Sequence, residues 1–121
     1  MNQVALVGNI TDDPELRFTQ SGKAVANFTL AVSHRSKASG EWKDVTDGFF
    51  TVTCWNGLAD NVAASLKKGA RTLVAGKLVQ RSFEVDGAKR STIEIVASQV
   101  GPDLSFATAE VAKVVREKQN A

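Results

Sequence analysis

Residues 49–69 read FFTVTCWNGLADNVAASLKKG, and this stretch decides the fold. Its first seven residues predict a β-strand, because every second residue from Phe50 to Cys54 is apolar and would form one face. The opposite face carries Phe49 and Trp55, with two threonines between them. The strand therefore has a complete apolar face for a core and two further aromatic side chains on the other side.

The second half of the stretch changes period. Leu58, Val62 and Leu66 recur every four residues, which is typical of the buried stripe of a helix. Two lysines and then Gly69 follow, a common signal for the end of a helix. A short helix is therefore predicted directly after the strand.

Two predicted strands precede this unit and two follow it. The earlier strands cover residues 3–10 and 25–33, and the later strands cover 71–83 and 91–98, with a turn at Asp86-Gly87. Residues 11–24 are rich in turn formers, and residues 34–44, HRSKASGEWKD, are predicted to be a long hairpin loop. Three strands, one helix and two strands match an all-β, five-stranded Greek-key barrel, the OB-fold, with its helix between strands three and four. Other small barrels share this count of elements.

The bulk composition sets limits on the class of protein. A chain of 121 residues is enough for one domain, and its formal net charge of +2 permits an anionic partner without demanding one. The single cysteine, Cys54, cannot form an internal disulfide, and its parity places it in the core. Neither a signal peptide nor a membrane-spanning apolar run is present in the sequence. We therefore expect a cytoplasmic, nucleoid-associated protein without membrane contact.

The outward aromatic residues suggest a surface for unpaired bases. Phe49 and Trp55 lie on the non-core face of one strand, and the strand at 71–83 places Lys77, Arg81 and Phe83 on one parity. Alternating cations and rings can hold phosphates and stacked bases together. The alternatives are that an aromatic side chain packs under a loop or in a subunit interface, and that the cations form a solvated edge.

Several further residues in the predicted loops could serve the same surface. Trp42 lies in a polar segment, where it could stack a base, hold the loop in place or pack against a neighbouring subunit. Individually, each loop cation is most often solvated surface. The cations of this kind are Arg17, Lys23, Arg35, Lys37, Lys43, Lys89 and Arg90.

Several motifs together resemble the bacterial single-stranded DNA-binding protein family, in its actinobacterial form. Those motifs are Val7-Gly8-Asn9, Asp13-Pro14-Glu15-Leu16-Arg17, Val25-Ala26-Asn27-Phe28, Gly40-Glu41-Trp42-Lys43, Trp55, residues 66–69 and Gln80-Arg81-Ser82-Phe83-Glu84. The similarity covers roughly residues 1–107. It implies an OB-fold domain over residues 1–100, sequence-independent binding of single-stranded DNA, and a homotetramer.

The resemblance also implies which residues bind DNA. Family members use four stacking aromatics, of which Phe49, Trp55 and Phe83 occupy three positions. The fourth falls near residues 34–36, where His34 is the available ring. The complete set of expected DNA-binding residues is Phe49, Trp55, Phe83, Trp42, His34, Arg17, Arg35, Lys37, Lys43, Lys77 and Arg81.

The last segment, residues 101–121, is expected to be an extension of the domain. VGPDLSFATAEV resembles the extra strand that clasps subunits together in actinobacterial members, and the Ala/Val/Lys-rich end is helix-like. Family members end in a Gly/Pro-rich linker and an acidic tip, whereas this sequence ends in REKQNA. The sequence is therefore expected to be either a truncated form or a specialised paralogue. In both cases we expect no recruitment of repair and replication proteins through such a tip.

No pattern of catalytic residues is present in the sequence. With a single histidine, a single cysteine and scattered glycines, it contains no His-based metal cluster, nucleophile elbow or phosphate-binding loop. We expect no enzymatic activity and no cofactor. The rival hypothesis is an OB-fold protein-interaction module of the replication-restart machinery, in which Phe49 and Trp55 would be buried at an interface and nucleic-acid binding would be weak.

Overall fold

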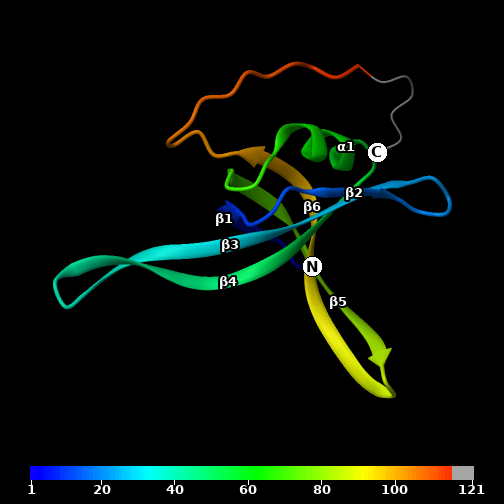
Figure 1. The fold of residues 1–121 in the computed structure, drawn as a ribbon, viewed down its shortest axis with the longest axis horizontal. Helices are drawn as coiled ribbons and strands as arrows, with labels where there is room; N and C mark the ends of the chain where they lie inside the picture. Colours follow the sequence, from blue (N-terminus) through cyan, green and yellow to red (C-terminus); the bar gives the residue numbers. More distant parts are fainter. Residues whose placement is uncertain (116–121) are drawn as a thin grey trace.

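Six strands and one helix make up the computed structural model, which describes residues 1–115 (Figure 1). In chain order they are β1 Val4–Ile10, β2 Glu15–Phe18, β3 Ala24–Ala38, β4 Glu41–Trp55, α1 Asn56–Ser65, β5 Arg71–Val85 and β6 Ala88–Pro102.

Five of these strands close into a barrel. The sheet order is β1-β5-β6-β4-β3-β2, and β1 also pairs with β3 through Asn9↔Ala31 and Ile10↔Leu30. β2 pairs with the first part of β3 and lies outside the closed ring. A closed five-stranded barrel with one helix between its third and fourth strands confirms the predicted OB-fold.

The alternating residues of the central strands fill the barrel. Phe28 of β3 and Val52 of β4 are cross-strand partners and both are buried, as are Leu30 and Ile95. Val62 and Leu66 from the α1 region pack onto the same core, which confirms the helical stripe. The described part of the chain has no helix with the length and apolar character needed to cross a bilayer.

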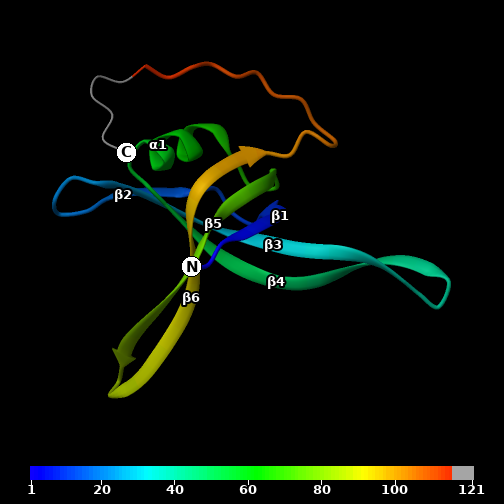
Figure 2. The same ribbon diagram turned by 180° about the vertical axis from the view of Figure 1, so that it is seen from behind.

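Two hairpins extend beyond the barrel as long ribbons. The β3–β4 ribbon and the β5–β6 ribbon project in different directions, while α1 covers another end of the barrel (Figures 1 and 2). Asp86 and Gly87 form the predicted turn at the tip of β5–β6, and both have positive φ, as a type I′ turn requires. Ser39 and Gly40 form an equivalent tip on β3–β4.

The β3–β4 ribbon corrects the prediction of a long loop over residues 34–44. Strand pairing continues to Ala38↔Glu41, so only the tip is a turn. The ribbon is solvated on both sides, and therefore its residues do not alternate between apolar and polar. Cross-strand pairs stabilise it instead, including Arg35 opposite Asp44 and Lys37 opposite Trp42.

The short strand β2 was also missed, inside the segment predicted to be turns. All four of its residues are exposed, so it has no apolar periodicity. Its place is set by pairing with β3, from Glu15↔Asn27 to Phe18↔Ala24. The turn formers lie on either side of it, and Gly22, with a φ of 87°, belongs to the β2–β3 turn.

Gly76 is required where β5 and β6 approach most closely. A Cβ at this position would overlap the carbonyl oxygen of Val96 and lie 2.9 Å from the Cα of Ala97. The register of the two strands also shifts between Ala75 and Gly76. The absence of a side chain therefore lets the strands pack at the bulge.

Cys54 lies in the core, as its parity predicted. It is completely buried, and desolvation raises the pKa of its thiol from 9.0 to about 12. The neutral thiol is thus the form that the fold favours. Its contribution to stability is complete below about pH 9 and is lost as the pH rises from there towards 12, because only the unfolded chain ionises readily in that range.

We expect Cys54 to be unreactive towards a thiol reagent in the folded protein. At pH 8 the native chain should react with 5,5′-dithiobis(2-nitrobenzoic acid) only at the rate of unfolding, whereas the chain in guanidinium should react fully within the mixing time. Stoichiometric reaction of the native protein within minutes would contradict the buried position.

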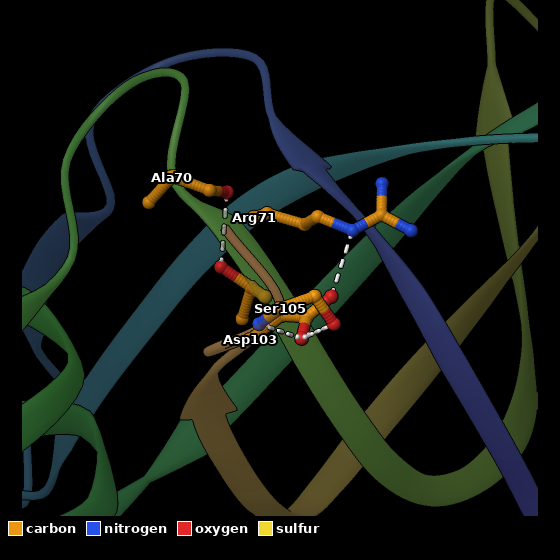
Figure 3. Close-up of polar contacts among 5 residues, drawn as sticks. Ala70, Arg71, Asp103 and Ser105 are labelled. Carbon is orange, nitrogen blue, oxygen red and sulfur yellow. Dashed lines mark hydrogen bonds and ion pairs between the residues drawn. The ribbon is translucent and has the colours of Figure 1, made fainter. Parts of the chain in front are cut away.

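The chain leaves the barrel after β6 through an anchored turn. β6 runs to Pro102, across the predicted domain boundary at residues 100 and 101. In Figure 3, Asp103 Oδ1 accepts hydrogen bonds from Ser105 Oγ and Ser105 N at 2.8 and 3.0 Å, and its Oδ2 accepts one from Arg71 Nε at 2.7 Å. The hydrogen bonds from Ser105, followed by that from Arg71, lower the pKa of the Asp103 carboxyl.

Between this anchor and residue 115 the chain forms no regular structure. Residues 104–115 run irregularly past α1 (Figures 1 and 2), so neither the predicted clasp strand nor a helical tail is formed there in the single chain. Positions 116–121 of the predicted extension lie outside the described residues. Leu104, Phe106 and Val111 are exposed on this arm.

Candidate nucleic-acid interface

The outward face of β3 and β4 carries two of the three predicted stacking residues. Phe49 is the cross-strand partner of Ala31, and Trp55 is the partner of Val25, whereas Val52 points into the core. Phe49 is 67% exposed and Trp55 is partly buried. Both rings therefore lie outside the barrel interior, with Trp55 seated more deeply where β4 meets α1.

The outward face of β5 carries the third predicted stacking residue, Phe83. Lys77, Arg81 and Phe83 share this face, and Phe83 is 47% exposed. Arg90 of β6 lies directly opposite Phe83. Antiparallel partners point to the same side of a ribbon, so Phe83 has Arg81 two residues before it on β5 and Arg90 beside it on β6.

The β3–β4 ribbon divides the remaining candidates between two faces. By register, Arg35, Lys37 and Trp42 share the face of Ala31 and Phe49, while His34 and Lys43 lie on the other face. Trp42 is 58% exposed, and Lys37 Nζ lies 5.9 Å from the centre of its ring. Trp42, not His34, is therefore the ring that continues the outward face along the ribbon.

Several candidate binding residues lie beside carboxylates. His34 Nδ1 lies 2.8 Å from Asp47 Oδ1, Arg35 Nη1 lies 3.9 Å from Asp44 Oδ1, and Arg17 Nε lies 3.7 Å from Glu15 Oε1. The pairs are largely exposed, and such pairs contribute little to stability. Lys43 and Lys77 make no ion pair with any residue in 1–115.

Thr53 is one of the two threonines predicted to lie between Phe49 and Trp55 on the outward face. It does lie on the outward face, but it is only 2% exposed because Asn27 and Glu94 cover it. Asn27 Nδ2 donates to Thr53 Oγ1 at 2.9 Å, and Thr53 Oγ1 donates to Glu94 Oε2 at 3.3 Å. A buried polar layer therefore lies between the positions of the outward aromatic residues.

Comparison with known proteins assigns the chain to a family. The model of the single-strand binding protein family matches residues 1–103. The chain belongs to the single-strand binding protein family. The single-stranded DNA-binding protein of Mycobacterium tuberculosis is 51% identical over 116 residues, which cover 93% of this chain and 71% of that protein. The protein of the same name from Corynebacterium glutamicum is 50% identical, over 93% of this chain and 52% of its own length.

A solved structure gives the same answer for the fold of this family member. The crystal structure of the small single-stranded DNA-binding protein from Streptomyces coelicolor superposes with a TM-score of 0.73 and 33% sequence identity. The match covers 85% of this chain and 94% of that one. The predicted resemblance is therefore confirmed by sequence and by structure.

The buried polar layer of this family member was not among the predicted site residues. The alternation along β3 puts Asn27 on the outward side, but burial of Glu94 depends on contacts among β4, β5 and β6 that lie far apart in sequence. Arg90 was noted only as a general cation. No cluster of His, Cys, Asp or Glu side chains suited to a metal ion occurs within residues 1–115.

Proposed function

We propose that this protein binds single-stranded DNA without regard to sequence, by stacking bases on outward aromatic rings and contacting phosphates with lysine and arginine. One observation carries the proposal. Phe49, Trp55 and Phe83 lie outside the core of the barrel, on strands that also present cations. Such aromatic side chains are costly to expose unless something covers them.

The chemistry of single-stranded DNA explains why it is the proposed partner. Every base has a π-face, so stacking tolerates any sequence and contributes about 1–3 kcal/mol per base. The phosphates between the bases are attracted to lysine and arginine. In a duplex the bases are stacked on one another and cannot present their faces, and duplex DNA is therefore excluded.

The proposed contacts are of two kinds, base stacking and phosphate binding. Phe49, Trp55, Phe83 and Trp42 stack bases. The proposed phosphate contacts are Arg17, Arg35, Lys37, Lys77 and Arg81. His34 and Lys43 lie on the other face of the β3–β4 ribbon and would meet a strand that wraps around its edge.

The biological role follows from passive binding. A protein that covers unpaired DNA protects it and removes hairpins during replication, recombination and repair, with no enzymatic step and no cofactor. The proposed setting is the cytoplasm, at the nucleoid.

We further propose that the protein works as a homotetramer. Within residues 1–115, the β1 residues with strand partners on the β3 side are Asn9 and Ile10, and Gly8 lies against the backbone of Ala31, so residues 4–7 present an open edge for a second copy. Leu73 on the adjacent strand is 46% exposed, and the arm after Asp103 exposes Phe106. Several copies would let one DNA strand bind at linked sites and gain avidity.

Light scattering after size-exclusion chromatography tests the oligomer. At micromolar concentration the protein should have the mass of four chains of 12.9 kDa. A monomer under the same conditions would contradict the proposal and leave the β1 edge without an explanation.

A fluorescence titration tests the proposed function. The chain has two tryptophans, Trp42 and Trp55, and both lie on the proposed interface. Addition of oligo(dT) should quench their emission, because stacked bases contact the indole rings. The affinity should fall steeply with salt, with a slope of about −0.7 per phosphate contact in a plot of log K against log salt concentration.

Two comparisons make this titration decisive. A blunt duplex of the same length should quench far less than oligo(dT) at equal concentration. A flat response to oligo(dT) across a wide concentration range would contradict the proposal and favour a protein-interaction module.

A further inference from the structure

A continuous polar chain crosses the outward face beneath the proposed stacking residues. Arg17 Nη2 donates to Asn27 Oδ1 at 2.7 Å, Asn27 Nδ2 donates to Thr53 Oγ1, and Thr53 Oγ1 donates to Glu94 Oε2. Arg81 Nε lies 2.8 Å from the other carboxylate oxygen, Glu94 Oε1. The five residues come from β2, β3, β4, β6 and β5 in that order, so the hydrogen-bonded series spans five adjacent strands.

The hydrogen bonds of this polar series run in one direction, towards the Glu94 carboxylate. From Arg17 to Thr53 each side chain passes its hydrogen bond in the same direction, and the series ends on the Glu94 carboxylate, which is only 8% exposed. Hydrogen bonds that end on a charge are about twice as strong as neutral ones and polarise their neighbours. Apart from the Arg81 ion pair, Glu94 Oε1 has no hydrogen-bond partner among the described residues.

The hydrogen-bonded series begins and ends with a guanidinium group, and each of these groups lies beside a proposed stacking ring. Arg17 pairs with Val25, which pairs in turn with Trp55, so these residues form one cross-strand row. Arg81 lies two residues before Phe83 on the same face of β5. The side chains of Arg17 and Arg81 remain 60% and 56% exposed, which leaves part of each group open to solvent.

We infer that Glu94 is a positioning residue for DNA binding: its buried carboxylate holds Arg81, and through Thr53 and Asn27 holds Arg17, at fixed places beside the rings that stack bases. This inference rests on the proposed function. Arg81 is held through Nε, and Arg17 is held through Nη2 with its Nε 3.7 Å from Glu15 Oε1, so each guanidinium keeps further N–H groups for a phosphate. The ordering of both long side chains would then be achieved on folding and not on DNA binding, which lowers the entropic cost of the complex.

A simple electrostatic role for Glu94 predicts the opposite result. A carboxylate on a surface that binds a polyanion repels it, so removal of the charge alone would tighten binding. A positioning role predicts weaker binding when the same charge is removed. The sign of the change in affinity therefore separates the two.

The test is the affinity of Glu94→Gln for oligo(dT), measured with salt as a variable. We expect binding about 3- to 10-fold weaker than wild type at moderate salt, and a salt slope smaller in magnitude by about 0.7, the value for one lost phosphate contact on a single strand. Glu84→Gln is the matched control. It removes the same charge from the opposite face of the same ribbon, and it should leave the affinity unchanged or slightly tighter.

A double-mutant cycle tests whether Glu94 acts through Arg81. In an Arg81→Ala background, Glu94→Gln should weaken binding by less than half as much, on a logarithmic scale, as it does in the wild type. Equal effects in both backgrounds, or tighter binding by Glu94→Gln with an unchanged slope, would overturn the inference. If Glu94→Gln does not fold, Thr53→Val tests the link from Glu94 to Arg17 without a change of charge: weaker binding supports the positioning role, and unchanged binding overturns it.

The wild-type titration keeps the two proposals apart. If the wild-type chain does not bind oligo(dT), the proposed function itself fails. If the wild type binds and Glu94→Gln behaves like Glu84→Gln, only the positioning role fails.

Discussion

Replacement of Phe49 and Trp55 together by alanine is expected to weaken the binding of oligo(dT) by roughly 30- to 20,000-fold. Each ring is proposed to stack one base, and a stacked base contributes about 1–3 kcal/mol, with tenfold in affinity for every 1.4 kcal/mol. Phe49→Ala alone should account for about 5- to 150-fold. Fluorescence anisotropy of a labelled oligonucleotide gives the affinity without relying on the tryptophan that is removed.

Phe18→Ala is the matched control for this prediction. Phe18 is 66% exposed and Phe49 is 67% exposed, but Phe18 lies on β2, on the opposite face from Arg17. Its loss should change affinity by less than twofold. Equal losses from Phe18→Ala and Phe49→Ala would show that exposed apolar surface in general, and not an ordered stacking face, attracts the DNA.

Thermal unfolding separates binding from stability in the same variants. Phe49→Ala should melt close to the wild type because its ring is mostly in solvent. Trp55→Ala should melt somewhat lower, since Trp55 is partly buried at the start of α1. A collapse of the fold in Trp55→Ala would place this ring in the core and remove it from the proposed interface.

Gly76→Ala is expected to destabilise the barrel by about 3 kcal/mol or more. The new methyl group would overlap the backbone of Val96 and crowd that of Ala97, and neither neighbour can move without opening the β5–β6 pairing. Overpacked interiors cost about 1–3 kcal/mol, and a clash with backbone lies at or above the upper end of that range. Chemical denaturation, at unchanged slope, measures the difference.

Gly101→Ala provides the control on the neighbouring strand. No atom lies within 4 Å of a Cβ built at Gly101, and its backbone is not in the left-handed region. The free energy of unfolding of the Gly101→Ala variant should stay within about 0.5 kcal/mol of the wild-type value. If Gly76→Ala were equally harmless, β5 and β6 would have to lie further apart than the structure places them.

Local periodicity predicted most of the barrel because the barrel strands are half buried. Phe50, Val52 and Cys54 alternate with outward residues, and the α1 region repeats its apolar residues every four positions, so each element could be read from its own residues. The outward position of Phe49 follows from the same parity. Its surroundings on the surface do not, because they depend on which strands become neighbours.

The missed features are those that depend on long-range pairing. The β3–β4 ribbon and β2 have no buried face, so no alternation marks them, and only their partners fix them as strands. Ile93 shares its parity with the buried Ile95, yet it is 60% exposed on the projecting β5–β6 ribbon. Glu94 reads as an ordinary surface carboxylate until β4, β5 and β6 enclose it.

Photochemical cross-linking maps the stacking contacts most directly. An oligonucleotide containing 5-iodouracil, irradiated in complex with the protein and analysed by mass spectrometry, forms bonds to aromatic side chains stacked on the base. We expect adducts at Phe49, Trp55 and Phe83, with Trp42 as a further site on the ribbon. Efficient adducts confined to Phe18 or Phe106, with none at Phe49, Trp55 or Phe83, would contradict it.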